Sequence, residues 1–375
     1  MSSDGRPPKH TAPPANVRVV EPVPYASPPG DRVRRFFKRN GRKLWWLHSA
    51  YALTLGIVVV AFAQKGFDHA RWLAVSVGAA WLLVVFFFRV HGSGKQQVHV
   101  HAAGGRTKML VFYAMTYVLK NLYQGMLFFL LPFYWKSTTF WVDNSWFVCV
   151  LGACALLSTL DIVFDRVVFR FRALAAAFHA FTLFGCLNLV VPALFPDTRT
   201  LSSLLIASAI TTLGFFTIHV NLRVFGDRRW LLLAAASLAL VVGLTYAGRR
   251  AIPPVPMYVS HGAVGTDVLP DGRLGMEVRV LHPDVIDKLV AITDVVVPGG
   301  RGDRLIHVWR HDGHEVHRAT EDTSRVSPPS ERGMVRLRST IGDRQLPSFL
   351  SGAWNVDVET QDGQLVGRAS FTVTN

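Results

Sequence analysis

The residues best suited to chemistry in this sequence are polar and titratable side chains inside apolar segments. Lys120, Asn121 and Gln124 interrupt the apolar stretch 113–135. A lysine within the hydrocarbon layer of a membrane is costly and is expected to have a partner inside the protein. Depths estimated at about 1.5 Å per helical residue place further groups at a similar level of the inner leaflet; these are Asp161, His179 and His219, with Asp165 just below them.

This intramembrane polar cluster allows two interpretations. In the functional one it relays protons or binds an ion, with Asp161 titrating, the imidazoles as shuttles or ligands, and Lys120 as the charge partner. In the structural one the carboxylates pair with Lys120 or with nearby arginines and fix helix packing; hydrogen bonds between membrane helices contribute about 0.6–2 kcal/mol. The histidines of the cluster do not share a helical face, so the sequence predicts no metal and no cofactor.

A second set of titratable residues surrounds one predicted hairpin near the C-terminus. The turn signal HDGH is flanked by polar residues that include four histidines, His307, His311, His314 and His317. An Asp-Gly pair between two β segments is typical of a tight hairpin turn. These histidines form a candidate surface for metal binding or pH sensing, and the alternative is an ordinary polar hairpin.

The aromatic residues of the same region have a structural interpretation. Trp309 and Trp354 alternate with polar residues, so we expect them in the core of a β domain rather than on a surface that stacks against glycans. The chain contains no GxSxG, SxxK, HExxH, P-loop or dinucleotide-binding motif. An enzyme is therefore not established, and a non-enzymatic role is favoured.

Long apolar blocks must position the intramembrane cluster. Half of the 375 residues are hydrophobic and only 17% are charged. The apolar residues gather in blocks of roughly 20, the length that spans about 30 Å of hydrocarbon. The sequence therefore predicts an all-α membrane bundle of seven spans, at 44–64, 72–90, 109–131, 145–164, 173–195, 201–222 and 230–248.

The distribution of basic residues predicts the orientation of this bundle. The formal net charge is +15, yet residues 251–375 hold 13 basic and 16 acidic side chains. Of the basic residues that flank the blocks, 17 lie on one side and six on the other. The positive-inside rule then places the N-terminus in the cytoplasm and the C-terminal domain in the periplasm of a bacterium. The pattern indicates a multi-pass inner-membrane protein in contact with the lipid bilayer and argues against nucleic-acid binding.

Composition divides the chain into four regions. Residues 1–43 are predicted to be a disordered, basic cytoplasmic tail, and residues 44–248 the transmembrane domain. Residues 249–256 are a Pro-rich linker. Short alternating segments with Gly-containing turns predict that residues 257–375 form an extracytoplasmic all-β, immunoglobulin-like sandwich.

Two pairs of stretches resemble known families. LKNLYQGMLFFLLPFYWKSTTFW (119–141) and STLDIVFDR (158–166) resemble a family of uncharacterised bacterial inner-membrane proteins. RLIHVWRHDGHEVHR (304–318) and GAWNVDVETQDGQLVGRASFTV (352–373) resemble the C-terminal periplasmic β module of that family, a domain of unknown function. Residues 324–340 depart from the Gly-rich, aromatic turn of the relatives. The resemblance implies a membrane location and an extracytoplasmic β domain, and it supplies no activity.

These observations lead to two functional hypotheses. In the first, the bundle anchors the β-sandwich, and the sandwich binds an envelope protein or an envelope glycan. In the second, the protein is a small transporter or membrane enzyme built around the intramembrane Lys/Asp/His cluster.

Overall fold

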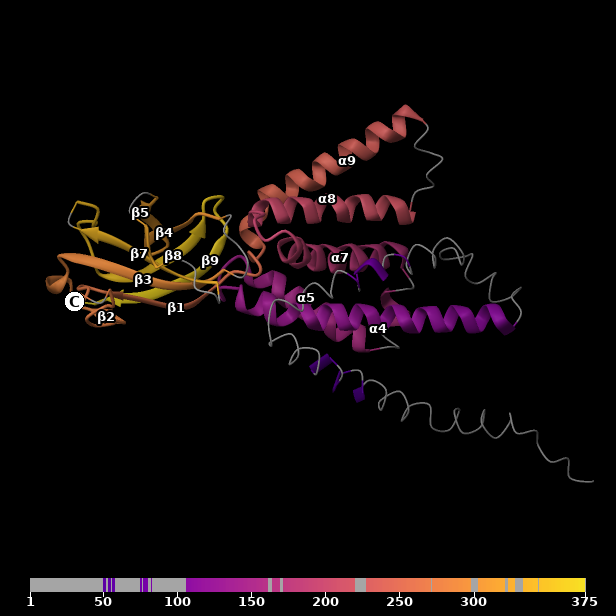
Figure 1. The fold of residues 1–375 in the computed structure, drawn as a ribbon, viewed down its shortest axis with the longest axis horizontal. Coiled ribbons are helices and arrows are strands. Elements are labelled where there is room, and N and C mark those ends of the chain that lie inside the picture. The colour runs from indigo at the N-terminus through magenta and orange to yellow at the C-terminus, as the bar shows by residue number, and fades with distance from the viewer. Residues whose placement is uncertain are drawn as a thin grey trace, which may run out of the picture. The chain divides into compact units, whose positions relative to one another are not determined.

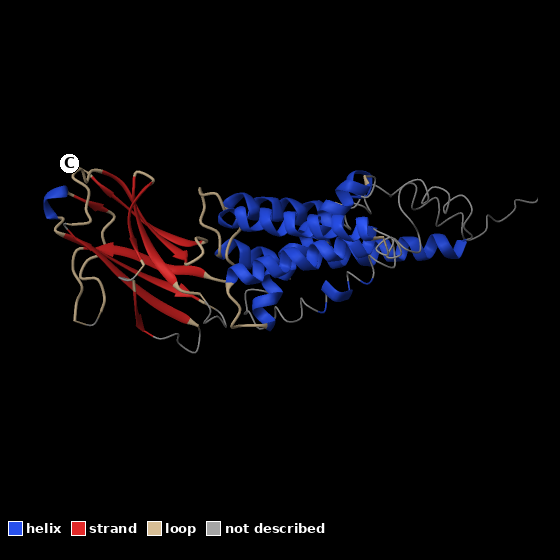
Figure 2. Cartoon of the chain, turned by 90° about the horizontal axis from the view of Figure 1, so that it is seen from above, coloured by secondary structure: helices blue, strands red, loops and turns tan. Residues whose placement is uncertain are grey.

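The computed structural model describes nearly all of the chain from residue 106 onward. The described residues are 106–160, 164–168, 171–219, 227–270, 272–297, 303–320, 323–327, 333–342 and 344–374, with a few isolated positions between 50 and 82. All of them belong to one compact unit, Ser49–Asn375. Figure 1 and Figure 2 show that the described part consists of helices followed by strands. The predicted tail, 1–43, lies outside the described residues.

The helices occupy the positions where the sequence places apolar blocks. α4 carries the polar residues 120, 121 and 124 within its 31-residue length, and α5 is 15 residues long. The helical elements are α4 (Arg106–Lys136), α5 (Ser145–Thr159), the π-helix η2 (Phe164–Val168), α7 (Arg172–Leu194), α8 (Thr200–His219), α9 (Arg228–Ala247) and the 3-10 turn η4 (Arg249–Ala251).

Three of the described helices are long and apolar enough to cross a membrane. The segments with this length and hydropathy are Ala173–Leu194, Thr200–Thr217 and Arg228–Ala247. The predicted seven spans are not supported as a whole. α5 ends at Thr159 and is capped by Leu160, so its apolar run is shorter than the predicted block 145–164. The blocks at 44–64 and 72–90 lie outside the described residues apart from the isolated positions.

The C-terminal part is built from two sheets. One has the order β1-β3-β7-β6 and the other the order β2-β9-β8-β4-β5. Neighbouring strands are antiparallel, except that β2 and β9 are parallel. The strands are β1 (Tyr258–Gly265), β2 (Val280–Leu281), β3 (Lys288–Val296), β4 (Leu305–His311), β5 (His314–Ala319), β6 (Ser324–Ser327), β7 (Met334–Gly342), β8 (Gly352–Thr360) and β9 (Leu365–Val373).

The two sheets pack face to face as a sandwich. One core cluster joins Leu289 and Ile341 of the first sheet to Trp309, Trp354 and Phe371 of the second. Both tryptophans are fully buried, because strand residues two apart point to the same face and these are the inward positions. The prediction that they belong to the core is confirmed.

Two stretches before β4 are only partly strand. The stretch 274–281 is a strand only at Val280–Leu281, and Leu274 makes an isolated bridge to Val268. The next stretch consists of the turn η5 (Pro283–Val285) followed by β3. The hairpin at HDGH is confirmed: Asp312 and Gly313 have φ values of 47° and 84° between β4 and β5. Positive φ at both central residues is what a tight hairpin turn requires.

The Pro-rich linker is not a free spacer. Val255 is 1% exposed and belongs to the core cluster of the helices. Met257, two residues later, is 2% exposed and belongs to a core cluster of the sandwich. The chain therefore passes from one apolar core into the other within three residues, which anchors the start of β1.

Candidate functional site: the charged face of the five-stranded sheet

The outward face of the five-stranded sheet carries an unusual density of charge. On β8, Trp354, Val356 and Val358 point into the sandwich, so Asp357 and Glu359 point out. In the antiparallel ladder Arg368 lies opposite Asp357 on β9, and Glu315 of β5 lies opposite Arg310 of β4. Residues that are directly opposite share a face, so this register collects charged side chains on one surface.

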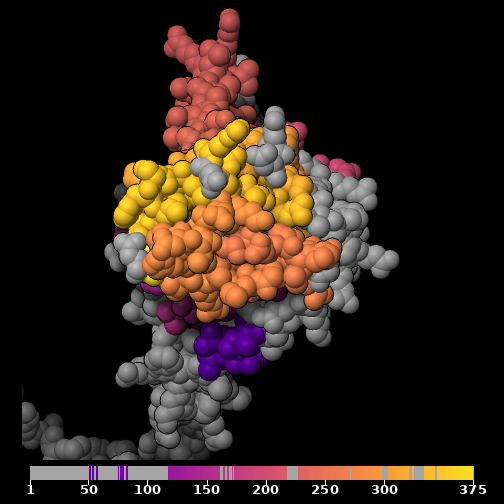
Figure 3. All heavy atoms as spheres, turned by 90° about the vertical axis from the view of Figure 1, so that its left-hand side faces the viewer, coloured from indigo at the N-terminus to yellow at the C-terminus, as the bar shows by residue number. Residues whose placement is uncertain are grey.

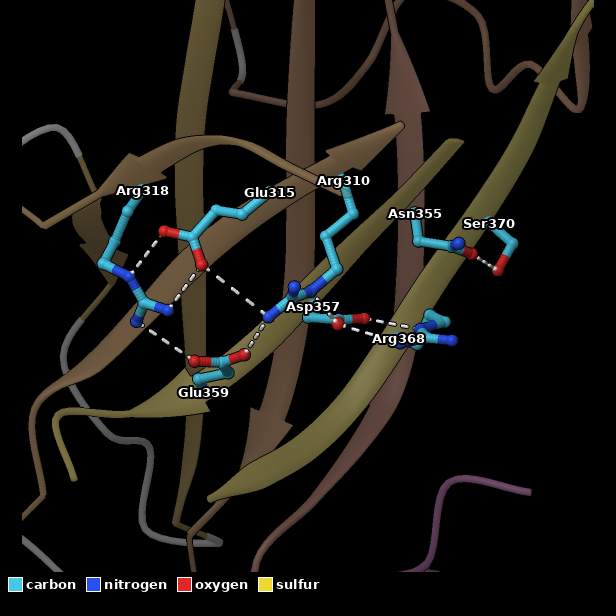
Figure 4. Close-up of polar contacts among 8 residues, drawn as sticks. All are labelled: Arg310, Glu315, Arg318, Asn355, Asp357, Glu359, Arg368 and Ser370. Atoms are coloured by element: carbon cyan, nitrogen blue, oxygen red, sulfur yellow. Dashed lines mark hydrogen bonds and ion pairs between the residues drawn. The ribbon is translucent and has the colours of Figure 1, made fainter. Parts of the chain in front are cut away.

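These side chains form one ionic network, drawn in Figure 4. Arg310 donates to Asp357 and to Glu359, each at 2.9 Å. Arg368 donates to both oxygens of Asp357, at 2.5 and 2.9 Å. Arg318 contacts Glu359 at 3.1 Å. It also makes a two-bond contact with Glu315, at 2.9 and 2.8 Å. Such two-bond pairs fix the planes of both groups.

The carboxylates at the centre of the network are buried, while the guanidinium groups are partly exposed. Asp357 and Glu359 are 2% and 5% exposed. Burial would lower the pKa of Arg310, but hydrogen bonds and charges from Glu359 and Asp357 outweigh it, so the pKa rises. The hydrogen bond from Arg318 holds the pKa of Glu315 below its ordinary value. Arg310 and Glu315 are therefore charged at neutral pH.

A groove of about 240 Å³ runs over this network. Its wall includes Arg310, Asp357 and Arg368 from the sheet, together with Asp143 and Arg250 from segments that adjoin helices. Asp143 and Arg250 are exposed, and neither makes a hydrogen bond or close ion pair with another described residue. The floor of the groove is thus a network in which acidic and basic side chains neutralise one another. Two further charged side chains lie on its edge.

Several contacts hold the sandwich against the helix ends beside this groove. The Asp303 carboxylate accepts hydrogen bonds from the Thr200 amide at 2.9 Å and from its hydroxyl at 2.7 Å. A carboxylate at that position caps the first turn of α8, whose amides lack partners within the helix. Burial raises the pKa of Asp303, and the bonds to Thr200 oppose that rise. Arg249 Nε donates to the Asp362 carbonyl at 2.7 Å.

The intramembrane cluster predicted from the sequence is placed only in part. Lys120 and Gln124 are buried on α4, at 8% and 4% exposure. His179 on α7 is buried as well, and its Nδ1 lies 2.6 Å from the Tyr123 hydroxyl. Asn121 is half-buried and donates to the Tyr117 carbonyl at 2.8 Å, within its own helix.

The remaining members of that cluster cannot be placed next to these. Asp161 lies outside the described residues. Asp165 belongs to η2 and His219 ends α8, and the description covers only their backbones. The predicted pairing of Lys120 with Asp161 therefore stays a prediction. Within the cluster, His179 makes a contact that crosses between helices, through Tyr123.

The four histidines of the outer domain do not form one surface. His307 is fully buried between the sheets, so its expected place on the candidate surface is corrected. Its Nε2 lies 2.8 Å from the Thr293 hydroxyl and its Nδ1 2.6 Å from the Ser339 hydroxyl. Burial lowers the pKa of His307 to about 4. The burial of His307 follows from its place on β4, because it points to the same face of the strand as Trp309.

The other histidines lie around the hairpin turn. The His311 ring lies tilted against that of Trp354 with 4.7 Å between ring centroids, and its Nε2 lies 3.0 Å from the Ser351 carbonyl. His314 is exposed and lies opposite His311 in the strand register of the hairpin, whereas His317 is half-buried and lies opposite Trp309. Among the described residues no three His, Cys, Asp or Glu side chains lie close enough together to hold a metal ion.

The charged network is not among the sites predicted from the sequence, although a signal for it was present. In WNVDVET, hydrophobic residues alternate with Asn355, Asp357 and Glu359. Three polar residues on one face, two of them acidic, need cationic partners on the neighbouring strands. Arg310 and Arg368 supply them, but only the strand register shows which arginines stand opposite.

Comparison with known families gives two matches and no activity. Residues 30–283 match the family of unknown function DUF5924, and residues 302–373 match the protein of unknown function DUF2914. No curated protein matches the chain. The first match includes β1 and β2 and the second includes β4 to β9, so the two matched regions contribute strands to the same sandwich. The first match spans more than half of the residues, and the chain therefore belongs to the family of unknown function DUF5924.

Proposed function

We propose that this chain is a multi-pass bacterial inner-membrane protein that presents an immunoglobulin-like sandwich in the periplasm. In this role the sandwich binds an envelope protein or a charged envelope glycan at the groove over its ionic network. The groove is the observation that carries the proposal. Its floor is formed by buried carboxylates that are bound by arginines, and it lies beside the helix ends that hold the sandwich in place.

The membrane placement is supported by hydropathy and charge. Three described helices have the length and composition of spans. Seven spans, with α4 and the blocks at 44–64 and 72–90 among them, agree with the distribution of basic residues. The sandwich contacts the ends of α8 and α9 that this topology assigns to the outer side.

The immunoglobulin-like assignment is supported by strand order. Sheets of the order β1-β3-β7-β6 and β2-β9-β8-β4-β5 correspond to the order A-B-E-D in one sheet and A′-G-F-C-C′ in the other. Trp309 on β4 then occupies the position of the buried tryptophan on strand C. The domain contains no cysteine, so the disulfide of antibody domains is absent from this sequence.

The charges of the groove favour a ligand that itself carries charge. Trp309 and Trp354 are fully buried and therefore offer no stacking platform to a neutral sugar. A preorganised array of guanidinium and carboxylate groups instead suits a ligand with complementary ionic groups, because electrostatic complementarity gives specificity. A protein segment with mixed charge or a glycan with acidic groups fits this description.

Blocking the groove provides the test. Asn355 faces outward beside the network and bonds to the Ser370 hydroxyl at 2.7 Å, so Asn355→Trp fills the groove and leaves the core intact. The matched control is Thr340→Trp, an exposed outward residue of β7 on the other sheet. In complementation of a deletion strain, Asn355→Trp should fail and Thr340→Trp should succeed, with equal amounts of both proteins in the membrane. Full complementation by Asn355→Trp would refute the proposal.

A small transporter or membrane enzyme is the second candidate function. It is favoured by the burial of Lys120, Gln124 and His179 on α4 and α7, and by the contact of His179 with Tyr123. Buried polar groups within membrane helices are often functional. Complementation by Asp161→Asn separates the two candidates. At equal amounts in the membrane, this variant should fail only if the bundle performs chemistry or transport. Deletion of 257–375, which spares Val255 in the core cluster of the helices, should fail only if the sandwich carries the function.

A further inference from the structure

A second cavity, of apolar character, lies between the helices. It has a volume of about 430 Å³ and is lined by side chains of α5, α7, α8 and α9. Its aromatic wall is formed by Trp146, Phe181 and Phe184, and its other wall by Val241 and Leu244 of α9. A cavity of this size is within the range of ligand-binding sites.

Of the three side-chain hydroxyls that line this groove, two are satisfied within the protein, and that of Thr211 has no hydrogen-bond partner among the described residues. The hydroxyl groups of Ser208 and Thr245 lie 3.0 Å apart, and Thr245 also donates to the Val241 carbonyl at 2.8 Å. The groove therefore presents chiefly hydrocarbon to an occupant. It follows one face of α9, because Val241, Thr245 and Gly248 are spaced at i, i+4 and i+7.

α9 itself is covered by very little of the described chain. None of its residues is buried, and Leu233, Leu240 and Leu244 are each about 60% exposed. Figure 1 shows α9 leaning away from α8 toward its N-terminal end, and Figure 3 shows it standing out from the remaining described atoms. An apolar helix exposed in this way belongs in hydrocarbon. The groove therefore opens toward the lipid phase.

The outer end of the apolar groove meets the charged groove at a single turn. Gly248, Ala251 and Ile252 line the apolar groove, and Arg250 lines the charged one. Neighbouring residues are about 3.8 Å apart along the backbone, so the two sites adjoin across η4. On the charged side, Arg250 and Asp143 make no close ion pair with another described residue, although Arg250 is near enough to Glu315 to help lower the pKa of that carboxyl. This pair offers a cation for a phosphate and an anion for an ammonium group.

From this juxtaposition we propose that the turn η4 marks a binding site for one zwitterionic phospholipid. An acyl chain lies in the apolar groove along α9, Arg250 binds the phosphate, and Asp143 binds the headgroup ammonium. This inference depends on the membrane placement proposed above but not on the envelope ligand. The lipid would tie α9 to the bundle at the level where the sandwich is docked.

The test uses the full-length protein in detergent, titrated with phosphatidylethanolamine and followed by native mass spectrometry. Arg250→Gln should weaken binding about ten-fold, the scale of one charge-assisted hydrogen bond. Its control is Arg229→Gln, which removes an exposed charge at the other end of α9. Ala180→Phe, which fills the groove from α7, should abolish retention of the lipid, whereas Ala177→Phe on an exposed face of the same helix should not.

Four results would overturn the proposal, the last of them concerning the acyl chain. The first is equal binding by Arg250→Gln and Arg229→Gln, and the second is equal retention by Ala180→Phe and Ala177→Phe. The third is a dimer that excludes the lipid, which would make a second copy the occupant of the groove. Free phosphoethanolamine should not compete at the concentration where the lipid saturates; if it does, the site recognises a headgroup alone and the acyl-chain assignment is wrong. Because Asn355→Trp fills the groove that Arg250 and Asp143 line, lipid binding by this variant is measured beside its complementation. Failed complementation with wild-type lipid binding is then assigned to the envelope ligand alone.

Discussion

The buried histidine of the sandwich core makes stability depend on pH in a defined direction. His307 has a pKa of about 4 in the folded protein, because burial disfavours the charged ring. The unfolded chain has a histidine pKa of about 6.5. As pH falls below 6.5 the unfolded state binds the proton first, so stability is complete above 6.5 and is lost progressively down to about 4.

The magnitude follows from the difference between the two pKa values. About 2.5 pH units at about 1.4 kcal/mol per unit give a total loss of about 3.5 kcal/mol. Between about pH 7.5 and pH 5 the expected loss is about 2 kcal/mol. The folded protein offers the charged imidazole no alternative environment at low cost, because both of its nitrogens face hydroxyl groups, those of Thr293 and Ser339, inside the core.

The assay compares the wild type with His307→Gln in lipid nanodiscs. Glutamine keeps a donor and an acceptor but does not titrate. Urea unfolding of the sandwich, followed by pulse proteolysis, gives the free energy of unfolding at both pH values. The wild type should lose about 2 kcal/mol more than the variant, since every other titrating group is common to both. Equal losses in the two proteins would refute the reasoning.

Three further predictions concern contacts within and beside the sandwich. Asp303→Asn should weaken the cap of α8 by about 1 kcal/mol and speed amide exchange in the turn that begins at Thr200, as measured by mass spectrometry; unchanged exchange would contradict it. Asp357→Asn should lower the free energy of unfolding of the sandwich by about 2 kcal/mol in urea, because two arginines lose their shared partner. Gly352→Ala should lower the free energy of unfolding by about 1–3 kcal/mol, as measured by thermal unfolding. The reason is that Gly352 has φ of 140° and an added Cβ would lie 2.6 Å from Asp312.

The fold of the outer domain was largely predictable from the sequence. Alternation around Trp309 and Trp354 predicts strands with these residues inward, and the HDGH turn predicts the hairpin between β4 and β5; the structure confirms both. The same two-residue period shows that His307 shares the face of Trp309. Grouping His307 with the exposed His314 was therefore an error that the pattern itself could have prevented.

The helical part was predictable at the level of apolar length. Blocks at 173–195, 201–222 and 230–248 correspond closely to α7, α8 and α9, because a helix needs about 20 apolar residues to span hydrocarbon. The block at 145–164 did not continue as one α-helix, since α5 ends at Thr159 before the π-helix η2. Hydropathy alone cannot locate such an interruption, because the change from α-helix to π-helix depends on backbone hydrogen bonding rather than on composition.

The sequence by itself determined which residues are apolar, which alternate, and where basic residues accumulate. Those local properties are sufficient to separate a helical region with membrane-spanning lengths from a C-terminal β domain. Only the tertiary structure decided that Asp357 meets Arg310 and Arg368, that Asp303 caps α8, and that two grooves of opposite character adjoin at η4. These contacts join residues far apart in the chain. They are set by strand register and by the docking of one core against another, which no local pattern encodes.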